Sequence, residues 1–308
     1  MKILLALGGN MISDSTNSSE IFSDQLNRIN QSAKLIVDIF EMGHEIIISH
    51  GNGPQVGSLL LQQNTEINGT VKLPLSILGA LTQGQIGVAL QHSLLNEFSL
   101  RQIKQDVIVI PTSIIVNSND EKFSNPTKPI GPYLDQSQYN KQIQKNKSWS
   151  YVETPNGFRR VVASPKPLQI LEINTIKSLL SNKALVICSG GGGTPISIDN
   201  NTISRKDAVI DKDLASSLLA NEINADVLII LTNVDGIYQN FNGDHPSIIS
   251  HMTSNEASKF LSTNSGGIGT MNPKINAAIN FNGQYTLITS PQNVMKALNN
   301  ESGTKISN

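Results

Sequence analysis

Short apolar runs of four or five residues recur along this chain, and they constrain its fold more than any other feature. The runs are continuous, without polar residues at alternate positions, as is typical of strands buried on both faces of a sheet. They occupy residues 3–7, 45–49, 107–110, 184–188, 227–231 and 285–289. Segments with helical periodicity lie between these runs. One extends from Leu26 to Phe40, and Gly43, just after it, suits a helix end. Strands alternating with helices predict an α/β sandwich around a mainly parallel sheet.

The composition excludes several classes of protein. The 308 residues carry 23 Lys and Arg against 24 Asp and Glu, so the chain lacks the basic excess of a nucleic-acid-binding domain. With Cys188 as the single cysteine, no intramolecular disulfide can form, which favours a reducing compartment. No run approaches the roughly 18 apolar residues of a membrane span, and residues 3–7 are too few for a signal peptide. We therefore expect a soluble, cytoplasmic protein that binds neither membranes nor nucleic acid.

One long segment interrupts the alternation. Residues 117–167 show no strong periodicity, yet they contain Tyr133, Trp149 and Tyr151. A loop of this length is uncommon inside a compact domain unless it forms a small unit of its own. A disordered linker is the alternative, but aromatic residues are uncommon in linkers. The segment is therefore predicted to be an inserted subdomain or lid.

Three glycine-rich loops directly follow predicted strands. They are Gly8-Gly9-Asn10, Gly51-Asn52-Gly53 and Gly190-Gly191-Gly192-Gly193. Glycines allow backbone N–H groups to approach an anion closely, and the carboxyl ends of parallel strands meet at one edge of a sheet. Each loop alone could be an ordinary tight turn. None has the spacing of a P-loop or of a dinucleotide-binding fingerprint, so a phosphate site here would be of another kind.

Three lysines stand near these loops or in the insert. Lys212 lies near the N-terminus of a predicted helix, and Lys274 follows Asn272 and Pro273, which read as N-cap and N1 of another. A lysine at a helix N-terminus opposes the macrodipole, and a bound anion would relieve the conflict. Lys128 lies between prolines that hold the backbone extended. Solvated surface lysines are the alternative. Together the loops and lysines indicate an α/β enzyme that handles phosphate.

The same motifs carry a family resemblance. They comprise residues 5–10, 49–57, 125–131, 159–167, 190–193 with Pro195, 209–216 and 271–274. In this order, through nearly the whole chain, they resemble the carbamate kinases of the amino acid kinase family.

The resemblance implies a fold and a reaction. The fold is a three-layer α/β/α sandwich, the amino acid kinase fold, which assembles as a homodimer. Residues 1–182 would form an N-terminal lobe with the carbamoyl phosphate or carbamate site, and residues 183–308 a C-terminal lobe with the nucleotide site. Residues 117–167 would form a protruding lid. The reaction is reversible phosphoryl transfer between carbamoyl phosphate and ADP, giving ATP and carbamate, and its implied role is arginine catabolism through the arginine deiminase pathway.

The resemblance also assigns residues. The implied catalytic residues are Lys128, Lys212, Asp213 and Lys274, with Asp213 orienting the lysines. The implied acyl-phosphate site comprises Gly8, Gly9, Asn10, Gly51, Asn52 and Gly53. The implied nucleotide site comprises Gly190, Gly191, Gly192, Gly193, Thr232, Asn233, Asp235, Met271 and Pro273. Mg²⁺ would be held mainly by nucleotide phosphates, with no protein ligands. Such a transfer depends on positioning and charge neutralisation more than on acid–base catalysis.

Some residues depart from the family pattern, and others receive structural interpretations. The departures are Met11, Leu81 and residues 266–270, which we expect to influence affinities more than the reaction class. His50 and Cys188 are interpreted as structural, and Arg159 and Arg160 as either structural or phosphate-binding. Two rival functions stay open: another amino acid kinase, such as an acetylglutamate, aspartate or uridylate kinase, and a catalytically inactive nucleotide-binding paralogue.

Overall fold

A central, mainly parallel sheet organises the molecule. The computed structural model describes residues 1–13, 22–64, 71–241, 245–263 and 271–307, and within them eight strands form this sheet. In spatial order they are β15 (His251–Thr253), β17 (Thr304–Ser307), β16 (Tyr285–Thr289), β12 (Val227–Leu231), β1 (Lys2–Leu7), β2 (Glu45–His50), β9 (Leu185–Cys188) and β3 (Val107–Ile110). All neighbours run parallel except β16 and β17. The predicted α/β class and mainly parallel sheet are confirmed.

All six predicted apolar runs are strands of this sheet. Three of them, β3, β12 and β16, begin and end at the predicted residues. Strand β17, between β15 and β16, was not predicted, because its buried residues, Thr304 and Ile306, alternate with partly exposed ones. A strand covered on one face gives no continuous apolar run.

Helices cover both faces of the sheet and complete a three-layer sandwich. One face packs against α1 (Phe22–Glu41), α3 (Leu75–Leu100) and α9 (Val294–Leu298). The other face packs against α5 (Ile173–Ser181), α6 (Lys212–Glu222), α7 (Ser254–Thr263) and α8 (Asn272–Ile279). After α1, Gly43 has a φ of +83°, which confirms its predicted place at the helix end. No helix in the described ranges is long and apolar enough to cross a membrane.

Smaller elements surround the sandwich. A second sheet has the strand order β11 (Thr202–Arg205), β10 (Thr194–Asp199), β4 (Ser113–Ile115) and β8 (Gln169–Ile170). β13 (Ile237–Gln239) and β14 (Ser247–Ile249) form a separate pair, and α2 (Gly53–Asn64) follows β2. The short 3-10 helices include η1 (Gly9–Met11), η2 (Glu121–Phe123) and η3 (Gly190–Gly192).

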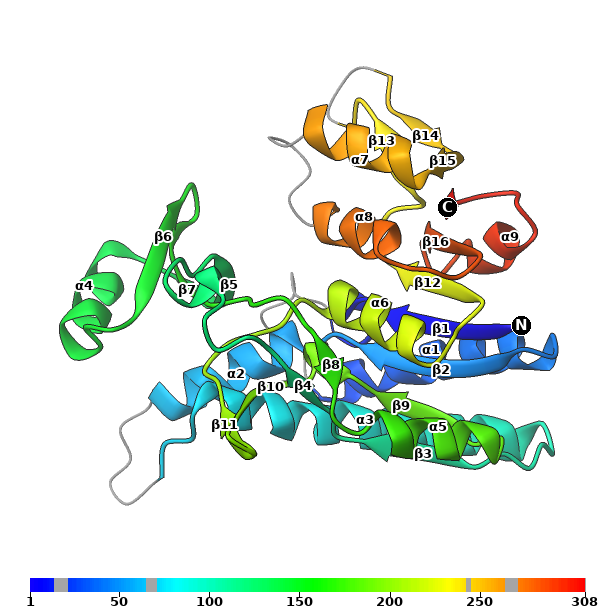
Figure 1. Ribbon diagram of the computed structural model, residues 1–308, viewed down its shortest axis with the longest axis horizontal. Coiled ribbons are helices and arrows are strands. Elements are labelled where there is room, and N and C mark those ends of the chain that lie inside the picture. The colour runs from blue at the N-terminus through cyan, green and yellow to red at the C-terminus, as the bar shows by residue number, and fades with distance from the viewer. Residues whose placement is uncertain (14–21, 65–70, 242–244, 264–270, 308) are drawn as a thin grey trace.

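The segment between β4 and β8, which contains the predicted insert at residues 117–167, is folded. It contains an antiparallel sheet of β5 (Lys128–Leu134), β7 (Gly157–Val162) and β6 (Ser150–Thr154), together with α4 (Gln136–Lys145). Figure 1 shows this unit projecting from the sandwich at the left. Its Ile130 and Val162 pack with Val56, Leu75 and Leu78 of α2 and α3, which docks the insert on the N-terminal part of the molecule.

The chain order does not divide the sheet at the predicted lobe boundary between residues 182 and 183. Strand β9 follows that boundary, yet it pairs with β2 and β3. The half of the sheet formed by β1, β2, β9 and β3 therefore includes a strand that the prediction assigned to the C-terminal lobe. This neighbour relation also fixes the position of the loop that follows β9.

Candidate active site

The order of strands creates a crevice between β1 and β12. From β1 the chain crosses through α1 to β2 on one side, whereas from β12 it leads to β16 on the other. Ligands of open α/β sheets bind outside the carboxyl ends of the strands at such a reversal. The two loops here touch, because a Cβ on Gly8 would lie 2.7 Å from the Leu231 carbonyl oxygen. Glycine is therefore required where the loop after β1 meets the loop after β12.

The loop after β2 joins the same place. A Cβ on Gly51 would lie 3.4 Å from the Gly9 backbone nitrogen and 3.8 Å from Cδ of Lys212. Gly53 is the first residue of α2, and a Cβ added there would meet no atom within 4 Å. Two predicted glycine loops and one predicted lysine thus converge. Asn10 lies in η1 beside them, and its side chain is outside the described part of the structure.

Two lysines share one buried carboxylate at this edge. The Nζ atom of Lys212 lies 2.7 Å from Oδ1 of Asp213, and Nζ of Lys274 lies 3.0 Å from Oδ2. Burial alone would raise the pKa of Asp213, but the two ammonium groups hold it down at about 2. Burial lowers the pKa of Lys212, Asp213 opposes that shift, and the charge of Lys274 adds to it. The two lysine side chains are 13–14% exposed and Asp213 is buried, so two positive charges face one negative charge with little access to water, which favours an added anion.

Helix starts place these three side chains. Lys212 and Asp213 are the first two residues of α6, and Lys274 is the third residue of α8. The α8 start differs by one position from the prediction, because Met271 stands at the N-cap and Asn272 is already helical.

Asp211 is not among the residues that the sequence predicts for the site, although the structure makes it central. Its Oδ1 accepts hydrogen bonds from the backbone nitrogens of Asp213 and Leu214, at 2.9 and 3.4 Å, and so caps α6. Its Oδ2 lies 2.5 Å from Nζ of Lys128 in the insert. An aspartate directly before a predicted helix is the usual N-cap signal, and this signal could have identified it. Lys128 is thereby held at the start of the helix that carries Lys212.

The glycine tetrad, residues 190–193, lies on the side of the acyl-phosphate loops. A Cβ on Gly191, whose φ is +62°, would overlap Nδ2 of Asn52, and one on Gly190 would lie 2.5 Å from Nε2 of His50. Two strands, β2 and β1, separate β9 from β12, a distance of about 14 Å at the usual strand spacing. This position argues against the expectation that the tetrad cradles nucleotide phosphates bound at the loop after β12.

The other predicted nucleotide residues lie in the loop after β12, beside the loop after β16, and at the start of α8. The Thr232 nitrogen donates to the Thr289 carbonyl, and Oδ1 of Asp235 accepts from Ser290 Oγ and Asn293 Nδ2, at 2.5 and 2.8 Å. These two hydrogen bonds lower the pKa of Asp235. Asp235 therefore ties two loops together. For Thr232, Asn233, Asp235, Met271 and Pro273 a nucleotide contact stays a prediction, and residues 266–270 lie outside the described residues.

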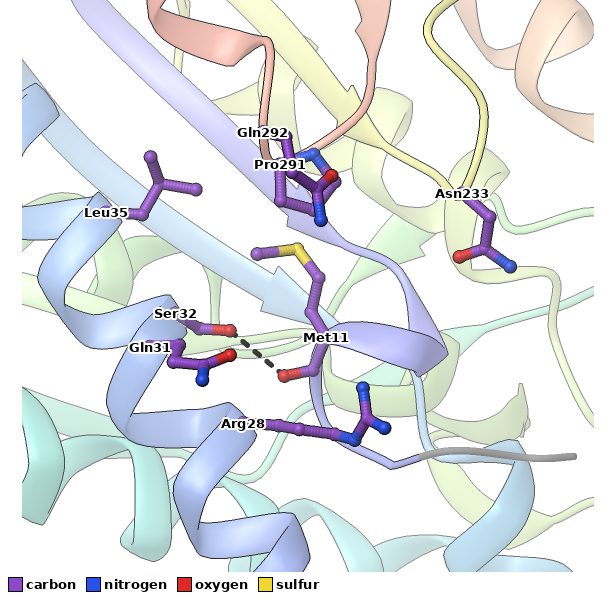
Figure 2. A pocket seen from close by; sticks show the side chains of 8 residues that line it. All are labelled: Met11, Arg28, Gln31, Ser32, Leu35, Asn233, Pro291 and Gln292. Carbon is purple, nitrogen blue, oxygen red and sulfur yellow. Dashed lines mark hydrogen bonds between the residues drawn. The ribbon is translucent and has the colours of Figure 1, made fainter. Parts of the chain in front are cut away.

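A cavity of about 450 Å³ lies on the opposite face of the sheet from the lysines, beside α1. Its lining residues are Met11, Arg28, Gln31, Ser32, Leu35, Asn233, Pro291 and Gln292. Figure 2 shows the Met11 side chain extending between α1 and Pro291. The Met11 carbonyl accepts a hydrogen bond from Ser32 Oγ at 3.0 Å, and its side chain belongs to the core cluster of α1 and α3. Met11 thus contributes to the packing behind the loop after β1.

His50, Cys188 and the two insert arginines have structural environments. Burial lowers the pKa of His50 to about 4, and its Nδ1 lies 3.1 Å from the Gly51 carbonyl oxygen, so the ring is neutral at pH 7. Burial raises the pKa of the Cys188 thiol, which packs as a small apolar group. Arg160 lies 3.5 Å above the Trp149 ring, and Arg159 donates to the Gly131 carbonyl at 3.1 Å. These contacts are consistent with structural roles for all four residues.

Comparison with known proteins relates this geometry to a family. The model of the amino acid kinase family matches residues 1–288. The carbamate kinase of Pyrococcus horikoshii is 37% identical over 99% of this chain and 98% of its own length, and that of Halobacterium salinarum is 39% identical over 98% and 97%. The solved structure of carbamate kinase from Giardia lamblia bound to AMP-PNP superposes with a TM-score of 0.91 at 34% identity, covering 99% of this chain and 98% of that one.

Proposed function

The chain belongs to the amino acid kinase family, and from this premise we propose that it is a carbamate kinase. It transfers the phosphoryl group reversibly between carbamoyl phosphate and ADP, giving ATP and carbamate, which decomposes to ammonia and CO₂. The observation that carries the proposal is the buried cluster of Lys212, Asp213 and Lys274 beside the glycine loops after β1 and β2. Similarity to carbamate kinases along the whole chain supplies the substrate.

The cluster suits transfer between two anionic partners. Cδ of Lys212 lies near Gly51, so the side chain passes the loop that we assign to the acyl phosphate. Lys274 lies in the first turn of α8, on the side of the proposed nucleotide residues. The two lysines neutralise charge on the transferring phosphoryl group. Asp213 pairs with one lysine through each carboxylate oxygen and so orients both. With His50 neutral and Cys188 protonated, positioning and charge neutralisation carry the reaction.

Magnesium would accompany the nucleotide in this reaction. Both oxygens of Asp213 are engaged by lysines, and in the described ranges no group of three or more His, Cys, Asp or Glu side chains could hold a metal. The donors present therefore fit a Mg²⁺ ion held through nucleotide phosphates and water. Bound in that way, the ion would neutralise phosphate charge on the nucleotide side.

The lid and the pathway rest on the family resemblance, and the role of the tetrad rests on its contact with Asn52. We propose that the insert acts as a lid that brings Lys128 to the acyl phosphate, and that the glycine tetrad supports this same substrate through Asn52. The proposed cellular direction is ATP formation in arginine catabolism through the arginine deiminase pathway, in the cytoplasm. Expression during growth on arginine, measured together with ATP yield in a deletion strain, tests the pathway separately from the chemistry.

A coupled assay tests the central proposal. Purified protein with carbamoyl phosphate, ADP and Mg²⁺ is expected to form ATP, measured through hexokinase and glucose-6-phosphate dehydrogenase. Chelation of Mg²⁺ should abolish the signal, and a reaction without protein gives the background. ATP formation only from other phosphorylated acids would indicate another amino acid kinase. ADP binding by calorimetry without turnover of any of these substrates would indicate an inactive paralogue.

We propose a homodimer that forms through α3. On the face away from the core the helix exposes Leu81 at 50%, Val88 at 43% and Leu95 at 40%. These residues are seven positions apart, so they form one stripe along the helix. The adjacent strand β3 is an edge of the central sheet in the described residues. A second copy that packs α3 against α3 would cover the stripe.

The dimer proposal predicts a change of mass in solution. Wild-type protein should elute at twice the 33.3 kDa chain mass in size-exclusion chromatography with light scattering. Val88→Asp should shift the protein toward the monomer, because it places a charge in the centre of an apolar interface. Leu100→Asp is the matched control, since Leu100 is exposed on the same helix but off the stripe. A dimeric Val88→Asp protein would exclude this interface.

A further inference from the structure

We infer that Thr82 on α3 is a positioning residue that sets the orientation of the Asn52 amide in the acyl-phosphate site. The inference rests on the proposed function, because Asn52 is assigned there to carbamoyl phosphate. Thr82 is fully buried and Asn52 is 8% exposed. The link between them crosses from the helix layer to a loop at the sheet edge.

The direction of the hydrogen bonds follows from the chemistry of the hydroxyl. Oγ1 of Thr82 donates its single proton to the Gly79 carbonyl, 2.7 Å away within α3. Toward Asn52 it can therefore only accept, and the Nδ2 atom of Asn52 donates to it at 2.8 Å. Because the nitrogen of the amide faces Thr82, the opposite orientation, with Oδ1 against the hydroxyl oxygen, is disfavoured. Thr82 thus decides which way the Asn52 amide presents its donor and its acceptor.

The other side of the Asn52 amide is bounded by the glycine tetrad. A Cβ added to Gly191 would fall within 2.5 Å of Nδ2, Cγ and Oδ1 alike, so the whole amide group lies over the Gly191 backbone. Glycine at this position leaves the space that the amide occupies. Asn52 is consequently held between a hydroxyl on one side and a backbone on the other.

The next residue of α3 secures the same loops. Oε1 of Gln83 accepts from the Thr112 backbone nitrogen at 2.8 Å, and its Nε2 donates to the Thr112 carbonyl and to Thr194 Oγ1, at 3.2 and 3.1 Å. Thr112 Oγ1 in turn accepts from the Ser189 nitrogen at 2.8 Å, directly before the tetrad. Through Thr82 and Gln83, α3 therefore positions both walls around Asn52.

The close packing of α3 against the sheet allows its Thr82 and Gln83 side chains to reach the loops around Asn52. A Cβ on Gly87 would lie 2.5 Å from Cγ1 of Val109 in β3. A glycine at this point lets the helix backbone approach the sheet closely. The side chains of Thr82 and Gln83, one turn earlier, can then span the gap to the loops after β2, β3 and β9.

Substitution of Thr82 tests the inference. In Thr82→Val the shape is kept and the hydroxyl is lost, so the KM for carbamoyl phosphate should rise roughly tenfold, the scale for one buried hydrogen bond. The KM for ADP should stay within about twofold. Thr82→Ser, which keeps the hydroxyl, should restore most of the affinity. Thr175→Val is the matched control, because Thr175 is exposed on α5.

The outcomes separate this inference from the proposed function. An inactive wild-type enzyme would overturn the proposed function, and the inference with it. An active wild type, with a folded Thr82→Val protein of unchanged KM for carbamoyl phosphate, would overturn the inference alone. Equal rises in both KM values, or no rescue by serine, would mean a general structural role and would also overturn it. If valine prevents folding, Thr82→Ala, which leaves room for a water, should give the same selective rise.

Discussion

Lys212→Ala is expected to lower kcat by at least roughly 10²-fold, the scale for removal of one preorganised group that stabilises charge in the transition state. The Lys212 side chain passes Gly51 and its ammonium group pairs with Asp213; in the proposed mechanism this group meets the transferring phosphoryl group. The measurement is steady-state kinetics with carbamoyl phosphate and ADP. Lys212→Arg should also remain impaired, because a planar guanidinium cannot reproduce the compact ammonium in a buried position.

The fold should survive the loss of Lys212. Asp213 keeps its ion pair with Lys274, so the substitution leaves no unpaired buried carboxylate. Thermal unfolding and circular dichroism check this point. Lys104→Ala is the matched control, since Lys104 is exposed between α3 and β3. A well-folded Lys212→Ala enzyme with an unchanged kcat would remove Lys212 from the mechanism.

The second large effect is expected for Lys128. Lys128→Ala should lower kcat by about 10- to 100-fold, again the scale for one positioned cation, while ADP affinity measured calorimetrically without carbamoyl phosphate stays within about twofold. The separation is expected because the insert docks through Ile130 and Val162 on α2 and α3, whereas the nucleotide is assigned to the loops after β12 and β16. Equal losses in turnover and in ADP affinity would contradict the lid model.

Asp211 provides the matched comparison for Lys128. Asp211→Asn should preserve the α6 cap, since asparagine caps helices about as well as aspartate, but it removes the charged partner of Lys128. The lysine charge remains, so turnover should fall less than in Lys128→Ala. Asp211→Ala removes the cap as well and should lower the unfolding temperature. A turnover loss in Asp211→Asn as large as that in Lys128→Ala would show that the ion pair itself is required.

Local patterns predicted much of the fold. Strands β3, β12 and β16 are continuous apolar runs, and they were predicted to the residue because strands buried on both faces carry this signal in their own sequence. The end of α1 was predicted from Gly43, whose positive φ is a local requirement. Strand β17 escaped prediction, because its alternating burial depends on what lies above and below it.

The residues of the candidate site likewise fall into those that local sequence signals predicted and those that only the structure revealed. Lys128, Lys212 and Lys274 were found from their neighbours in sequence, since prolines, an Asp-Lys-Asp start and an Asn-Pro start are local signals. Thr82 and Gln83 carried no signal of this kind. They lie in the middle of a helix, and their role depends on partners 29 to 111 positions away. Only the packing of α3 against β3 reveals them.

By itself, the sequence determined the α/β class and the family, and it predicted the insert and the site lysines. These depend on periodicity and on motifs whose residues are neighbours in the chain. The tertiary structure alone decided that β9 lies beside β2, that the glycine tetrad therefore faces Asn52, and that Asp211 holds Lys128. Strand order is set by crossover connections and by packing between distant segments, and no local pattern in the chain encodes which of several similar apolar strands will become neighbours.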